Sequence, residues 1–86
     1  MQSFSSFKSH LSLLDRYADG KFDKRNRERN KIIIKRRLGL DGYEIETLEN
    51  IGMDYGMTRE RIRQIEKGFM EYLMKPHIMK ILEPYR

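Results

Sequence analysis

The chain has 86 residues, and 18 Lys and Arg against 13 Asp and Glu give it a formal net charge of +5. It has no cysteine, which excludes disulfides, thiolate chemistry and cysteine zinc sites, and its two histidines leave little for a metal centre. No apolar run approaches the about 20 residues that span a bilayer, and the start lacks the features of a signal peptide. We therefore expect one small cytoplasmic domain without cofactors, whose basic excess suits an anionic partner.

Residues 1–22 predict a first helix. Apolar side chains recur at helical spacing from Phe4 to Ala18. The pair Asp19-Gly20 indicates where this helix ends, with Gly20 as a left-handed cap.

Residues 23–40 predict a second helix, which Asp23 can cap and Gly39 can end. Leu40 then stands where an apolar residue packs beside a glycine cap. The three isoleucines at 32–34 could by themselves form a buried strand. Because they lie inside a long charged segment that ends at a glycine, we favour a helix.

Residues 41–46 are predicted to form a loop, and no strand pattern or internal repeat occurs in the chain. Pro76 interrupts the long periodic segment that comes next, and residues 77–83 predict a short last helix. These elements predict an all-α domain of four or five helices that spans residues 1–86 and has no wing.

Residues 47–74 predict a helix-turn-helix. Thr47 and Thr58 are placed to cap its two helices, and Gly56 in the short link can adopt the positive φ of such a turn. Gly52 is small at the point where the two helices must cross. Two helices that only pack together would share part of this pattern, but the two glycines favour the helix-turn-helix.

The second helix of this unit has an apolar side and a charged side. At about 100° per residue, the stripe expected to be buried comprises Ile62, Ile65, Phe69 and Leu73. The charged side and its flanks comprise Arg59, Glu60, Arg61, Arg63, Gln64 and Lys67. Arginine can donate two bonds to guanine, glutamine can pair with adenine, and glutamate can accept from cytosine. A solvated face is the alternative, but the position near the helix N-terminus favours DNA binding.

The segment TLENIGMDYGMTRERIRQIE, residues 47–66, closely resembles the helix-turn-helix of region 4 in bacterial sigma-70 family sigma factors. Residues 58–66 look identical to those of the primary sigmas, and RERNKIIIKRRLGL, residues 27–40, is similar to the family's region 4.1. The resemblance implies a domain that recognises the promoter minus-35 element in double-stranded DNA while docked on the flap of the RNA polymerase β subunit.

The resemblance also implies roles for individual residues. Those that match contacts to base edges or adjacent phosphates are Arg59, Glu60, Arg63 and Gln64. Those that match positions near the DNA backbone are Arg29, Arg37, Thr47, Leu48 and Glu49, to which we add Thr58, Arg61 and Lys67. Apolar residues of the first, second and last helices are expected to fill the core, with some available to the flap: Phe4, Phe7, Leu11, Ile33, Leu38, Ile81 and Leu82.

The chain departs from the family pattern after Glu66, where it reads KGFMEYLMK. Gly68 disfavours a helix by about 1 kcal/mol relative to alanine, which indicates a close approach or a bend. We therefore predict that a different protein partner replaces the family's activators here, at a surface of Phe69, Met70, Tyr72 and Met74. An extended core stripe is the alternative explanation for these residues.

Promoter melting in the family requires a separate domain, so we expect this chain to bind promoters without opening them. A second sigma-like subunit, an activator or an anti-sigma factor would then be a further partner, as for a phage or mobile-element product. Two rival functions remain: a free-standing dimeric regulator that needs no polymerase, and a sigma mimic that occupies the flap or an anti-sigma factor. We expect no enzyme activity, because no histidine lies near a nucleophile in sequence and no glycine-rich phosphate loop occurs. Membrane binding is disfavoured because the polar face mixes acids with bases.

Overall fold

The computed structural model describes the backbone of residues 2–82 and the side-chain environments of residues 11–81. This range contains five helices and no strand: α1 (Gln2–Lys21), α2 (Lys24–Leu38), α3 (Leu48–Tyr55), α4 (Arg59–Leu73) and α5 (Pro76–Leu82). The all-α prediction is therefore confirmed. The packing expected of Phe4, Phe7 and Leu82 lies outside the described side chains.

The ends of α2 are set by local hydrogen bonds that the sequence predicts. The Asp23 carboxylate accepts a hydrogen bond from the Asn26 N–H at 2.9 Å, which satisfies one of the free donors of the first turn. Gly39 has a φ of 71°, and its N–H and that of Leu40 both donate to the carbonyl of Lys35. The isoleucines at 32–34 lie inside this helix, so the helical interpretation of that run is confirmed.

Gly20 does not end α1, and the cap predicted there is wrong. The helix continues through Lys21, and the Phe22 N–H still donates to the carbonyl of Ala18 at 3.0 Å. Because Asp23 begins the next helix directly afterwards, no left-handed residue is needed between the two.

The helix-turn-helix forms through two threonine caps and one glycine turn. The hydroxyls of Thr47 and Thr58 each accept a backbone N–H three residues ahead at 3.1 Å. Gly56 has a φ of 65°. A β-carbon on Gly52 would lie 2.5 Å from the carbonyl oxygen of Met57, so only glycine permits the turn to fold back this closely. All four local predictions are confirmed.

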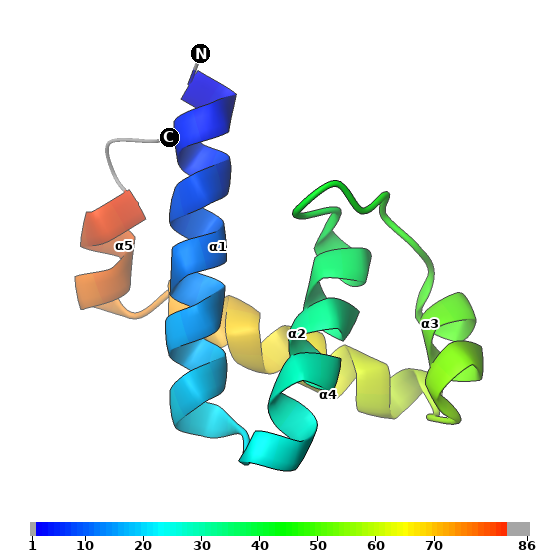
Figure 1. Ribbon diagram of the computed structural model, residues 1–86. Helices are drawn as coiled ribbons and strands as arrows, with labels where there is room; N and C mark the ends of the chain where they lie inside the picture. The colour runs from blue at the N-terminus through cyan, green and yellow to red at the C-terminus, as the bar shows by residue number, and fades with distance from the viewer. Residues whose placement is uncertain (1, 83–86) are drawn as a thin grey trace.

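The core lies where α4 crosses the other helices (Figure 1). In the figure, α4 runs from α3 at one end of the molecule to α1 and α5 at the other, and it contacts all four remaining helices. The buried core cluster comprises Leu14, Tyr17, Ile33, Ile34, Ile51, Ile62, Ile65 and Phe69. Leu73 is partly buried against it, which confirms the predicted stripe of α4. Ile78 anchors α5 by burial, whereas Ile81 is 41% exposed and is not part of the core, which leaves it among the residues expected to be available to a partner.

Arg36 ties α2 to the loop and to α3. Its Nε and Nη2 donate to the two carboxylate oxygens of Glu46 at 2.6 and 2.8 Å, and Nη2 also donates to Asp54. The guanidinium lies over the ring of Tyr55, 5.8 Å from its centroid. The side chain is 13% exposed, so these bonds are partly shielded from water and fix the position of α3.

Candidate nucleic-acid interface

The first two turns of α4 present a compact polar surface. Arg59, Glu60, Arg63 and Gln64 are all exposed. Arg63 donates from Nε and Nη2 to the Glu60 carboxylate at 3.0 and 2.6 Å, and the Gln64 side-chain amide lies 3.5 Å from the same carboxylate. The structure therefore brings three of the four predicted base-contacting residues together, with Arg59 beside them at the start of the helix.

The pairing with Glu60 leaves Arg63 able to bind a base. A guanidinium has five N–H donors, and the bonds to Glu60 use one edge, formed by Nε and one N–H of Nη2. The end formed by Nη1 and Nη2 stays open, and this end can donate two bonds to O6 and N7 of guanine. The hydrogen bonds from Arg63 lower the pKa of Glu60, and Glu60 in turn raises the pKa of Arg63. Both side chains are therefore held in their charged forms.

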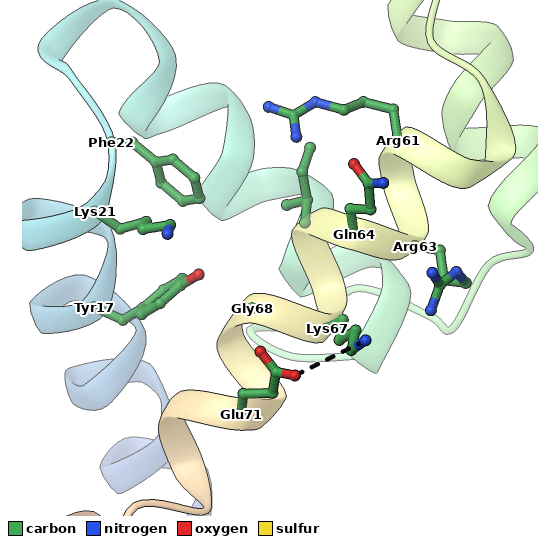
Figure 2. Close-up of a pocket in the computed structure, with 10 residues that line it drawn as sticks. Tyr17, Lys21, Phe22, Arg61, Arg63, Gln64, Lys67, Gly68 and Glu71 are labelled. Carbon is green, nitrogen blue, oxygen red and sulfur yellow. Dashed lines mark ion pairs between the residues drawn. The ribbon is translucent and has the colours of Figure 1, made fainter.

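Three further predicted residues flank this surface. Arg61 and Lys67 are exposed on α4, and Lys67 lies 3.9 Å from Glu71 in a loose ion pair (Figure 2). The hydroxyl oxygen of Thr58 accepts its capping bond from the Arg61 N–H, which leaves the O–H free to donate to a phosphate at the N-terminus of α4.

At the start of α3, only some of the residues predicted to contact the DNA backbone are exposed. Thr47 and Glu49 are exposed, whereas Leu48 is partly buried against the core. A helix N-terminus attracts a phosphate, but the Glu49 carboxylate in the first turn opposes it. Thr47 is thus the more favourable neighbour for a phosphate at this position.

The two arginines of α2 that were predicted to contact the DNA backbone differ in how strongly other residues of the protein bind them. The Nε of Arg29 donates to the side-chain oxygen of Asn30 at 3.1 Å, and Asn30 is 1% exposed. Arg29 is therefore positioned by a buried partner. Arg37 is bound inside the protein, because its Nε donates to Glu66 at 3.1 Å and its Nη1 donates to the carbonyl of Glu46 at 3.0 Å. Its main observed contact is a bridge between α2, α4 and the loop.

The surface predicted for a different protein partner is divided by the structure. Phe69 is fully buried, which corrects its assignment to an exposed partner surface, since its ring fills the space between α1 and α4. Tyr72 is partly buried, with its ring 5.1 Å from that of Tyr17. Met70 and Met74 are 42% and 69% exposed and remain available to a partner.

Residues of α1 lie beside the α4 surface, and the sequence did not predict them there. Figure 2 shows Tyr17, Lys21 and Phe22 facing α4 across a cleft of about 540 Å³. The other wall comes from α4 and includes Arg61, Arg63, Gln64, Lys67, Gly68 and Glu71. The one signal in the sequence was Gly68: a β-carbon there would lie 2.3 Å from the hydroxyl oxygen of Tyr17. Of the two explanations expected for Gly68, a close approach or a bend, the structure shows the close approach.

Among the described residues, no three His, Asp or Glu side chains are grouped so that they could hold a metal ion. Within the same part of the chain, no helix is long and apolar enough to cross a membrane.

Known proteins match this chain across the helix-turn-helix. A family model described as sigma-70, region 4, matches residues 27–73. The RNA polymerase sigma factor RpoD of Helicobacter pylori is 44% identical over 59 residues, which cover 67% of this chain and 9% of that protein. The sigma factor SigA of Microcystis aeruginosa is 42% identical over 57 residues, covering 66% of this chain and 14% of that protein. The corresponding SigA of a Bacillus species is 41% identical over 58 residues, covering 67% and 15%. The chain thus spans between 9% and 15% of the length of these relatives. No solved structure gave a significant match.

Proposed function

The chain belongs to the sigma-70 region 4 family, and on that premise we propose that it recognises the minus-35 element of promoter DNA while docked on the flap of the RNA polymerase β subunit. Membership of this family makes it a DNA-binding domain of the sigma-factor type. We further propose that it acts in the bacterial cytoplasm.

One observation carries the DNA part of the proposal: the exposed polar residues of α4 stand at its N-terminal end. In helix-turn-helix proteins, this end of the second helix enters the major groove. Arg63 keeps an open pair of donors for guanine, and the Gln64 amide can pair with adenine. Flanking cations such as Arg61 and Lys67 suit the phosphates that border a groove. The surface therefore combines base readers with backbone contacts.

Docking on polymerase requires apolar surface that the core does not use. Among the side chains that the structure describes, seven large apolar residues are more than a third exposed: Tyr43, Ile45, Met53, Met70, Met74, Met79 and Ile81. Ile45 and Met53, at 70% and 80%, are the most exposed of them. These exposed apolar side chains support docking on a protein partner.

The polymerase part can be tested by capture of a purified β-flap fragment on the immobilised 86-residue chain, with an unrelated fragment of the β subunit as the control. The proposal predicts capture of the flap fragment alone. A stable homodimer at micromolar concentration that captures no flap would instead support a free-standing regulator. Capture of the flap by a chain that binds all DNA duplexes equally weakly would support a sigma mimic. An activator, an anti-sigma factor or a second sigma-like subunit can be added to the same assay as a competitor or co-ligand.

A further inference from the structure

The cleft between α1 and α4 has a cationic end that no ion pair among the described residues neutralises. Lys21, at the end of α1, and Arg61, in the first turns of α4, both line the cleft and are exposed. Neither forms an ion pair with any residue that the structure describes. Figure 2 shows the Arg61 side chain extended over the cleft, with Lys21 and Tyr17 on the side of α1.

The charge of the cleft changes along its length. At the other end, Glu71 lies 3.9 Å from Lys67. Burial and the nearby Glu71 carboxylate raise the pKa of Tyr17, which keeps its hydroxyl protonated and able to donate. The Glu71 carboxylate offsets the charge of Lys67 at that end, so the strongest attraction for an anion lies at the end between Lys21 and Arg61.

This cationic end is continuous with the proposed base-reading surface. Arg63 and Gln64 belong to that surface and also line the cleft. A helix in the major groove has a row of phosphates along each border of the groove, and basic groups beside the base readers contact them. The opposite wall of the cleft, formed by α1, would then stand against one of these borders.

We propose that the cleft receives a backbone phosphate of the DNA duplex that α4 reads, and that Lys21 and Arg61 bind this phosphate from opposite walls. The inference rests on the proposed function and adds to it a contact from α1. Lys21 lies outside residues 27–73, which match the family model. The contact would therefore belong to this chain's own N-terminal helix.

The test is DNA binding by the full chain and by Lys21→Ala, measured by fluorescence anisotropy at 50 to 200 mM salt. Lys80→Ala is the matched control, because Lys80 is an exposed lysine of α5 that does not line the cleft. Loss of one phosphate contact makes the slope of log K against log salt shallower by about 0.9. The ratio of the DNA-binding constant of the unmodified chain to that of Lys21→Ala should consequently be about 3.5-fold smaller at 200 mM than at 50 mM salt. Lys21→Arg should retain the slope, and Lys80→Ala should leave it unchanged.

A second measurement locates the phosphate. Single neutral methylphosphonate groups are placed in turn along both strands of a minus-35 duplex, and each duplex is bound to the unmodified chain and to Lys21→Ala. The proposal predicts one or two neighbouring positions at which neutralisation weakens the unmodified chain but not Lys21→Ala. If each methylphosphonate weakens Lys21→Ala as much as it weakens the unmodified chain, the proposal is overturned. A salt slope that Lys21→Ala leaves unchanged would overturn it as well. If the unmodified chain fails to distinguish minus-35 from scrambled DNA, the proposed function fails, and the slope on scrambled DNA still decides whether Lys21 binds a phosphate.

Discussion

The hydroxyl of Tyr17 occupies the space in which a β-carbon of residue 68 would lie, and residue 68 is glycine. A β-carbon there would be 2.3 Å from the hydroxyl oxygen. The ring of Tyr17 packs 5.6 Å from that of Phe69 and 5.1 Å from that of Tyr72. The glycine that departs from the family pattern in α4 thus complements α1, whose residues lie outside the match to the family model.

Replacing Gly68 with alanine tests this relationship directly. Gly68→Ala should lower the free energy of unfolding, because overpacking typically costs about 1–3 kcal/mol and exceeds the roughly 1 kcal/mol that alanine gains in helix propensity. In a Tyr17→Phe background the nearest remaining atom, the ring carbon Cζ, lies 3.5 Å away, an ordinary contact distance. Gly68→Ala should therefore become neutral or stabilising there, as measured by urea unfolding. Equal effects in both backgrounds would contradict the proposed contact.

Two other glycines should respond in opposite directions. Gly52→Ala should destabilise the protein by about 1–3 kcal/mol, because the new β-carbon would lie 2.5 Å from the backbone oxygen of Met57, which cannot rotate away. Gly20→Ala should stabilise it by up to about 1 kcal/mol, since Gly20 is helical and a β-carbon there would have no neighbouring atom within 4 Å. Thermal unfolding measures both. A destabilised Gly20→Ala would indicate that α1 ends at that glycine after all.

The bond between Arg36 and Glu46 predicts a pH dependence of stability. Hydrogen bonds from Arg36 lower the pKa of Glu46 below its ordinary value of 4.5. A carboxyl group with a lowered pKa stabilises the folded state above the unfolded pKa, and this contribution is lost as pH falls through the folded pKa. Glu46→Gln should therefore be less stable than the unmodified chain at pH 7, and the difference in melting temperature should shrink below about pH 4.5. Glu44→Gln is the control, because Glu44 is exposed in the same loop and forms no ion pair among the described residues. A difference that stays constant with pH would argue against this ion pair.

Arg63 and Lys67 are predicted to contribute to DNA binding in different ways. Arg63→Lys keeps the charge but loses the paired donors, so it should lose about 1–3 kcal/mol of discrimination between the correct and a changed base pair while keeping its salt dependence. Lys67→Ala should leave discrimination unchanged and make the salt slope shallower by about 0.9. Titration of both variants with both duplexes at several salt concentrations separates these effects. Retained discrimination by Arg63→Lys would count against a two-bond contact with guanine.

The features that could be predicted from sequence depend on residues close together in the chain. Thr47 and Thr58 cap helices through a backbone N–H three residues away, and Gly56 turns the chain at its own position. The prediction at Gly20 is wrong because a glycine permits a left-handed turn without requiring one, and the next residues of the chain decide whether it forms.

Long-range partners could not be predicted in this way. Arg36 sits in a run of basic residues, and its bonds to Glu46 and Asp54 depend on how the loop returns to α2. For the same reason Gly68 indicated a close approach but gave no sign that Tyr17 makes it. The residue types of α4 were enough to predict the chemistry of its surface. The position of α1 as the opposite wall of the cleft could be seen only in the folded structure.

We propose above all that the N-terminal face of α4 recognises base pairs. The most direct test compares the affinity of the full chain for a duplex containing TTGACA with its affinity for a scrambled duplex of equal length, at one fixed salt concentration. We expect at least about tenfold tighter binding to TTGACA, because a single well-read base pair contributes about 1–3 kcal/mol. Arg63→Ala and Gln64→Ala should each remove much of that preference while binding the scrambled duplex nearly as before. Equal affinity for the two duplexes, or equal losses on both in the variants, would contradict base recognition by this surface.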